Sequence, residues 1–179
     1  MSVPEKKALI DFTTRWIKQF DNAPKSEELH AIPSPCIIKT EQLAVYWQPF
    51  LLQPAKTLAI AEQLVGITLQ QSAHIFYGTQ YAGNMSAKFE QTNLVLLQAW
   101  NDDDFSNLEQ NIIAHLLQQK KLRRLPTIFI AATDESTEIV ALNNLTGEVV
   151  IEDLISGEVR PLAENLTCFL NKLTVFPAA

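Results

Sequence analysis

Two sets of residues in the sequence could in principle do chemistry. Cys36 and His74 could act as a nucleophile and its base, and the three aspartates at positions 102–104 have the composition of a magnesium-binding cluster. Their surroundings support neither reading. A thiol between two other apolar positions is more typical of a small buried side chain. Consecutive carboxylates on a helix point in different directions, so capping of a helix explains the aspartates better.

Other catalytic and metal-binding patterns are missing from the sequence. It contains no G-x-x-x-x-G-K-S/T, no G-x-G-x-x-G and no G-x-S-x-G motif. His30, His74 and His115 are far apart, and Cys36 and Cys168 lack the spacing of a structural zinc site. We expect His115 to be a partly buried or interface residue. The sequence therefore predicts a protein that is not an enzyme and has no metal, no cofactor and no small-molecule substrate.

The charge of the chain favours a basic partner. Its formal net charge is −6, and such an acidic surface disfavours nucleic acid. The alternative is that the acidity serves solubility alone. One basic run, K-K-L-R-R at 120–124, could suggest nucleic acid or anionic lipid. It follows a predicted helix that begins with aspartates, so we interpret it as the favourable complement of the helix dipole.

Aromatic residues give a second indication of a binding surface. Tyr46 and Trp47 are neighbours on a predicted strand, so they should face opposite sides of it. Tyr77 and Tyr81 lie in a stretch that is polar and interrupted by glycines, which predicts partial exposure. Exposed aromatic side chains beside carboxylates are typical of a protein-binding groove, although packing in a core is the alternative for each residue.

These residues must be positioned by a mixture of helices and strand hairpins. We predict helices at 4–20, 57–65 (capped by Gly66) and 102–122, and a last one from Pro161. Predicted strands are 43–48, 87–90, 94–100, 127–132, 138–142 and 148–151, and 67–83 reads as a strand or a structured loop near the surface. Hairpins without regularly interleaved helices indicate an α+β fold with a mainly antiparallel sheet and helices packed around it.

Length and hydropathy predict one domain over residues 1–179. A chain of this mass buries enough surface for a single core. No apolar run is long enough to span a bilayer, and the first residues lack the apolar run of a signal peptide, so we expect neither membrane insertion nor export.

Several short segments, in this order and spacing, resemble the Syd family of SecY-interacting proteins. The resemblance covers about residues 8–173 and is loose at 50–56, at 134–138 and beyond 173. No single segment is diagnostic, but the set is specific. The segments are S-E-E-L (26–29), P-S-P-C-I-I (33–38), A-V-Y-W-Q-P (44–49), H-I-F-Y (74–77), T-Q-Y-A-G (79–83), L-L-Q-A-W (96–100), D-D-F (103–105), L-P-T-I-F-I-A (125–131), N-L (144–145) and G-E-V (147–149).

The resemblance implies a fold, a partner and a location. The fold would be the SUKH-like α+β type. The protein would be cytoplasmic and peripherally associated with the inner face of the bacterial inner membrane. There it would bind SecY, the central subunit of the protein-translocation channel, and monitor its assembly. Family members have an acidic, concave groove that receives basic cytosolic loops of SecY. Other proteins of the superfamily are immunity proteins, so inhibition of a nuclease toxin is the alternative function.

Nine residues are the candidates for contact with such a partner. Acidic side chains would meet its basic groups, and aromatic side chains would supply apolar contact area, because exposed ion pairs alone contribute only about 0–1 kcal/mol. Gln80 is included because it lies in the same matched segment as Tyr81. The candidates are Glu27, Glu28, Tyr46, Trp47, Tyr77, Gln80, Tyr81, Asp103 and Asp104.

Overall fold

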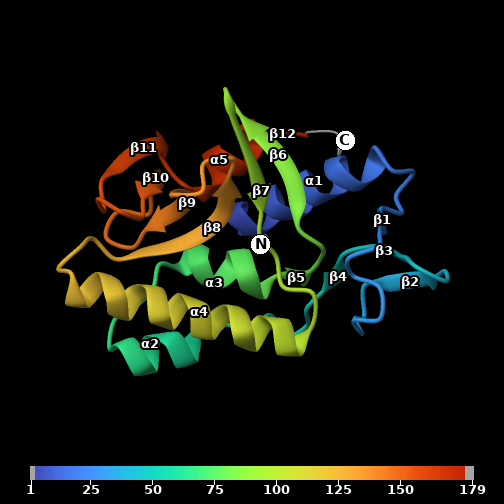
Figure 1. Cartoon of the computed structure of the whole chain (residues 1–179), viewed down its shortest axis with the longest axis horizontal. Coiled ribbons are helices and arrows are strands. Elements are labelled where there is room, and N and C mark those ends of the chain that lie inside the picture. The colour runs from blue at the N-terminus through green and yellow to red at the C-terminus, as the bar shows by residue number, and fades with distance from the viewer. Residues whose placement is uncertain (1–2, 176–179) are drawn as a thin grey trace.

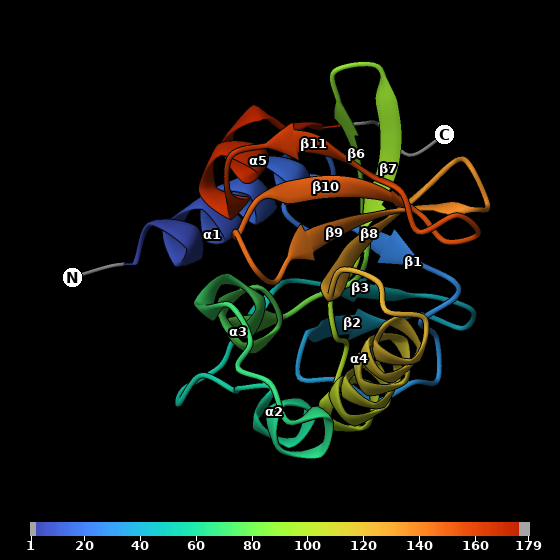
Figure 2. The same cartoon turned by 90° about the vertical axis from the view of Figure 1, so that its left-hand side faces the viewer.

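A curled antiparallel sheet of seven strands forms the centre of the computed structural model, which describes residues 3–175 (Figures 1 and 2). The strand order is β11-β10-β9-β8-β7-β6-β12, and each neighbouring pair is antiparallel. The strands are β6 (Met85–Phe89), β7 (Thr92–Leu96), β8 (Thr127–Thr133), β9 (Glu138–Asn143), β10 (Val149–Asp153), β11 (Val159–Ala163) and β12 (Thr174–Val175).

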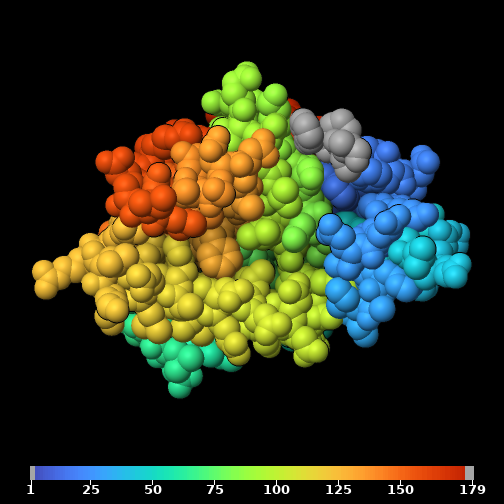
Figure 3. Space-filling view, viewed as in Figure 1, coloured from blue at the N-terminus to red at the C-terminus, as the bar shows by residue number. Residues whose placement is uncertain are grey.

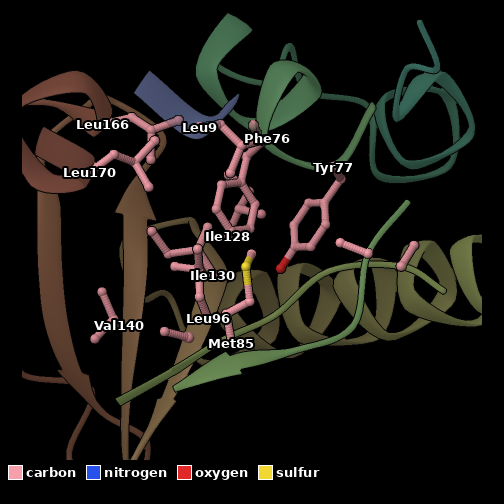
Figure 4. Packing of buried hydrophobic residues seen from close by; sticks show 14 of the residues in the cluster. Leu9, Phe76, Tyr77, Met85, Leu96, Ile128, Ile130, Val140, Leu166 and Leu170 are labelled. Carbon is pink, nitrogen blue, oxygen red and sulfur yellow. The ribbon is translucent and has the colours of Figure 1, made fainter. Parts of the chain in front are cut away.

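Five helices surround this sheet, which confirms the predicted α+β class. Helices α1 (Pro4–Lys18) and α5 (Leu166–Lys172) pack together, and α3 (Gln71–Gly78) packs against α1. The long helix α4 (Asp102–Lys121) contacts α2 (Ala59–Val65) and β8. Figure 4 shows the apolar core where side chains of α1, α3 and α5 meet those of the sheet. Among the helices in residues 3–175, none is both long and apolar enough to cross a bilayer.

Two small sheets lie beside the N-terminal end of α4 (Figure 1). One has the order β1-β3-β2, from β1 (Lys25–Ser26), β3 (Val45–Trp47) and β2 (Ile37–Thr40). The other pairs β4 (Phe50–Leu51) with β5 (Gln80–Tyr81). These short strands place the segment around residues 24–33 opposite α4, and that placement matters for the site described below.

Helix α4 agrees closely with its prediction because its signals are local. The Asn101 side chain accepts a hydrogen bond from the Asp104 backbone N–H at 2.8 Å, and the Asp104 carboxylate accepts one from the Trp100 N–H at 2.7 Å. The two bonds form a variant of the capping box, in which the N3 carboxylate bonds the residue before the cap Asn101. Lys120 and Lys121 occupy the last turn, as expected for the helix dipole. The predicted cap of α2 is also confirmed, because Gly66 has φ +77° and its N–H bonds the Glu62 carbonyl.

The segment 67–83 differs from its prediction as a strand or surface loop. Its larger part forms α3 and the short β5, and most of the segment is buried. Its glycines mark close approaches of the chain: a Cβ on Gly78 would lie 1.8 Å from the Lys56 carbonyl oxygen, and one on Gly83 would lie 2.8 Å from the Trp47 ring. Glycine is required there by packing and does not signal an exposed turn.

The last helix begins later than predicted. Pro161 lies in β11, which is an edge strand of the sheet, and α5 starts at Leu166 after the cap Asn165. Proline is tolerated on an edge strand because its missing N–H does not break a ladder on both sides. The hairpin predicted from 87–100 also ends earlier, at Leu96, and residues 97–101 lead into α4.

Candidate binding groove

Three adjoining hollows form one groove, called the groove below. Two of them lie along the N-terminal half of α4, and the third lies between α1, the segment 24–29 and the start of β6. The largest, about 340 Å³, lies between α4 and the start of β6, and hollows of about 220 and 290 Å³ continue it. Leu29 lines all three, and Asp104 and Asn107 line two of them. Figure 3 shows the surface hollowed between α4, the β6–β7 hairpin and the segment before β2. The lining residues come from 16–33, Trp47, 82–86, 97–111 and Phe129.

The wall opposite α4 is held by hydrogen bonds to the segment that enters the helix. The Ser34 hydroxyl donates to the Trp100 carbonyl at 2.6 Å, and the Trp100 indole N–H donates to the Ile32 carbonyl at 3.0 Å. The Asn101 side chain donates to the Pro33 carbonyl at 2.7 Å. The groove therefore has two fixed walls, because these bonds join segments almost seventy residues apart in the sequence.

The floor beneath the groove is a satisfied network of buried amides. Gln98 donates to the carbonyls of Phe76 and Leu97, and its side-chain oxygen accepts a hydrogen bond from Gln80 at 3.0 Å. Gln80 also donates to the Thr13 hydroxyl of α1 at 2.8 Å. These amide groups already have hydrogen-bond partners within the protein, so they fix the floor of the groove. Groups that can bind a partner must therefore lie on the rim.

The rim of the groove carries three carboxylates. Glu28 and Asp103 are exposed, and Asp104 is half-buried because one of its oxygens serves the helix cap. Lys25 is the single basic lining residue of the three hollows, and it pairs with Glu41 at 3.2 Å, outside the groove. The hydrogen bond with the Glu41 carboxylate raises the pKa of Lys25, which keeps that pair charged and mutually compensated. Three of the four predicted acids, Glu28, Asp103 and Asp104, are therefore among the lining residues of the three hollows.

Asp102, the first of the three aspartates, is committed to a different contact. Its carboxylate pairs with Lys56 at 2.8 Å and accepts the Tyr81 hydroxyl. The bonds from Lys56 and Tyr81 lower the pKa of Asp102. Lys56 also lies over the rings of Phe105 and Tyr81, so this aspartate fastens the chain before α2 to the start of α4. The aspartates are thus divided between a structural contact and the groove.

The predicted exposure of Tyr77 and Tyr81 is wrong, and Trp47 is the buried member of the pair Tyr46 and Trp47. Tyr77 is fully buried, and Trp47, Gln80 and Tyr81 are only 2–3% exposed. Tyr77 donates its hydroxyl to the Phe129 carbonyl inside the core, where burial raises its pKa well above the usual value. Trp47 reaches the groove lining with only this small area. Packing in the core, the alternative left open above, therefore describes these side chains.

Two further candidates lie at the surface but outside the groove lining. Glu27 is exposed and is not among the lining residues of the three hollows. Tyr46 is half-buried on the small sheet, where the ammonium groups of Lys25 and Lys39 lie 5.7 and 5.0 Å from its ring centre. The pairing of strands thus separates Tyr46 from Trp47, as their opposite facing predicts.

Sequence reasoning missed three asparagines of the groove. Asn84, Asn107 and Asn111 are exposed and line its largest hollow. Asn107 lies three positions after Asp104, and Asn111 lies four positions after Asn107. Asp104, Asn107 and Asn111 therefore share one face of α4. That spacing was visible in the sequence. Which face of α4 stays open is decided by the distant wall around Leu29, and this could not be read from spacing alone.

The Cys36–His74 pair is explained by structural contacts. Cys36 is buried, and burial raises the pKa of its thiol to about 11, which opposes formation of the reactive thiolate. His74 accepts the Leu58 backbone N–H at its Nδ1 atom, 2.9 Å away, and its Nε2 atom lies 3.5 Å from Glu62. In the described residues 3–175, no group of three His, Cys, Asp or Glu side chains is arranged to hold a metal ion.

Comparisons with known proteins agree with the resemblance seen in the sequence. The family model described as Syd protein (SUKH-2) matches residues 6–175. Protein Syd of Shigella boydii serotype 18 (strain CDC 3083-94 / BS512) and Protein Syd of Escherichia coli (strain K12 / DH10B) are each 44% identical to the chain over 171 residues. Each of these matches covers 93% of the chain and 94% of the relative. The similarity therefore includes the whole groove.

Proposed function

Because the chain belongs to the Syd family, we propose that it binds the SecY subunit of the protein-translocation channel through the groove. The observation that carries the proposal is that Glu28, Asp103 and Asp104 line adjoining hollows that share Leu29. The protein acts without catalysis, as a regulator or monitor of SecY assembly. It is cytoplasmic and associates peripherally with the cytoplasmic face of the inner membrane.

The charge of the groove suits the cytosolic loops of a membrane protein. Loops on the cytoplasmic side carry an excess of lysine and arginine, so an acidic groove complements them. Complementary charges act mainly on the association rate, while contact area in the groove slows dissociation. The exposed part of Leu29 and the apolar lining around Trp100 provide such area beside the carboxylates. A basic segment with interspersed apolar residues is therefore the best-fitting ligand.

The central experiment measures capture of detergent-solubilised SecY by the purified protein. We expect the double variant Glu28→Lys with Asp103→Lys to lose at least about tenfold in affinity, while its melting temperature stays nearly unchanged. The matched control is Glu135→Lys with Glu158→Lys, which changes the net charge equally at exposed positions outside the groove lining. Equal losses of affinity in both double variants would mean that SecY responds to the net charge of the protein and not to the position of the groove acids.

Two further outcomes would overturn the proposal. Binding to SecY that is insensitive to salt between about 50 and 300 mM would contradict an electrostatic groove, because the screening length falls strongly over that range. Retention of the protein in the membrane pellet after carbonate and high-salt washing would contradict peripheral association. Capture of a nuclease toxin in place of SecY would favour the immunity-type alternative, whose basic target the same groove would fit.

A further inference from the structure

We propose that the groove binds its ligand as an extended chain, with Asn107 and Asn111 hydrogen-bonded to alternate peptide groups of that chain. The inference rests on the proposed function and goes beyond it, since it assigns the backbone of the ligand to two amides and only its basic side chains to the acids. Recognition would then tolerate many sequences, provided that a basic residue lies at the correct end.

The spacing of the two asparagines matches the repeat of an extended chain. Residues four apart on an α-helix are separated by about 6.0 Å along its axis. In an extended segment, the peptide groups that face the same side recur every second residue, at about 6.6–6.8 Å. Asn107 and Asn111 lie on one face of α4 and both line the largest hollow, so a strand running along the helix would present successive peptide groups to them.

The chemistry of the amides suits this role. Each asparagine side chain offers a carbonyl acceptor and an NH₂ donor, so it can bond the N–H and the C=O of a peptide group. Among residues 3–175, no hydrogen bond engages the side chains of Asn107 and Asn111, and both residues are exposed. Asn84, across the groove, already accepts the Gln98 backbone N–H at 3.0 Å, so the two helix amides are the available pair.

The acids define the direction in which the charge of the ligand must lie. Asp103 and Asp104 are at the N-terminal end of the same helix, and Asn111 lies seven positions after Asp104. That interval is about 10.5 Å, the length of roughly three residues of an extended chain. A basic side chain placed about three residues from the peptide group at Asn111 would therefore reach the carboxylates without bending the ligand.

The test uses short overlapping synthetic peptides that cover the cytosolic loops of SecY, and SecY itself in detergent. For the tightest peptide, N-methylation of each residue in turn removes one backbone donor at a time. We expect affinity to fall about three- to tenfold at two positions that are two residues apart, but not at the position between them. Each of the variants Asn107→Ala and Asn111→Ala should abolish the affinity loss caused by N-methylation at one of those two positions. A double-mutant cycle detects this coupling between the asparagine and the peptide group.

The matched control is Gln110→Ala, an exposed amide on α4 that is absent from the lining of the groove. Unchanged melting temperatures would show that the asparagine variants fold normally. Peptides that depend on Glu28 and Asp103 but show neither the alternation nor the coupling would overturn the extended-chain inference and leave the proposed function standing.

If no peptide binds, the same variants are compared on SecY. Loss of affinity in the double variant Asn107→Ala with Asn111→Ala, with the Gln110→Ala control unchanged, supports the inference. Wild-type affinity in that double variant overturns it. Failure of the wild-type protein to bind SecY would overturn the proposed function, and the inference would fall with it.

Discussion

Two polar clusters lie on opposite halves of α4, and they differ in whether their groups already have partners. Near the C-terminal end, the buried carboxylate of Glu152 accepts hydrogen bonds from Gln119 and Thr127, both at 2.7 Å. His115 lies 3.6 Å from it. In the groove at the other end, Asp103, Asn107 and Asn111 are exposed. The closed cluster holds α4 to the sheet, whereas the open one has bonding capacity left for a partner.

The closed cluster shows that a polar or charged group is not by itself a sign of a binding site. Burial raises the pKa of Glu152, but the nearby His115 and the hydrogen bonds from Thr127 and Gln119 outweigh that effect, and the pKa lies below its usual value. The carboxylate is therefore stabilised in its charged form by the fold. A group satisfied in this way costs stability when changed and contributes nothing to recognition.

The largest expected loss of stability is at Tyr77, a buried residue beneath the groove floor that has no free bonding group for a partner. Tyr77→Ala should lower the free energy of unfolding by about 3–5 kcal/mol, because it removes a fully buried ring and leaves a cavity. Thermal or urea unfolding measures this directly. Tyr77→Phe should cost only about 1 kcal/mol, from the lost hydrogen bond to Phe129. A Tyr77→Ala variant of wild-type stability that merely releases SecY faster would instead place Tyr77 in the interface.

The next effect concerns the closed cluster itself. Glu152→Gln should lower the free energy of unfolding by about 1–3 kcal/mol, since one acceptor oxygen becomes a donor that faces other donors. Capture of SecY by the folded fraction should not change. Glu158→Gln, at an exposed position, is the control and should stay within about 0.5 kcal/mol of wild type. A Glu152→Gln variant that keeps wild-type stability but loses SecY binding would show that Glu152 contacts the partner.

The pH dependence of stability sharpens the same contrast. The pKa of Glu152 is lower in the folded state than in the unfolded chain, so its ionised form stabilises the fold. This contribution is fully present above the unfolded value, about 4.3, and is lost as the pH falls through the lower folded value. We therefore expect the stability gap between wild type and Glu152→Gln to shrink in acid, as measured by urea unfolding from neutral pH downward. A gap that grows in acid would mean that the folded state raises the pKa of Glu152 above its unfolded value.

The contrast between the clusters also explains what the sequence could predict. Helix α4 was placed closely because its cap, its apolar spacing and its basic end are all local signals. Helix α3 was missed because its glutamines and glycines resemble a loop, while contacts with α1 and with Lys56 decide its conformation. Tertiary packing overrides local preference at such places.

The sequence singled out acids that line the groove, but it could not predict the shape of the groove. Glu28, Asp103 and Asp104 were identified from matched segments, and the structure places them on the lining of the three adjoining hollows. The exposure of Tyr77 and Tyr81 was wrong because alternation along one strand or helix cannot show what packs above it. The open face of α4 depends on the bonds of Ser34 and Trp100 to distant segments, and no spacing rule contains these.

The smallest effect is expected from a single exposed charge of the groove, and it tests whether position matters as well as sign. Asp103→Asn keeps the shape of the side chain and should change the free energy of unfolding by less than about 0.5 kcal/mol. It should slow association with SecY about two- to threefold at low salt, because one of three converging carboxylates is lost. The difference should vanish at high salt, where the charge is screened.

The control for this variant is Glu135→Gln, which removes one exposed negative charge from the turn between β8 and β9, outside the groove. If the groove acids act through their location, Glu135→Gln should leave the association rate nearly unchanged in the same stopped-flow measurement. Equal slowing by both variants would mean that the ligand senses only the net charge of the protein. Slower dissociation in Asp103→Asn would contradict the model more strongly, because a carboxylate in contact with a basic side chain can only retain the ligand, never repel it.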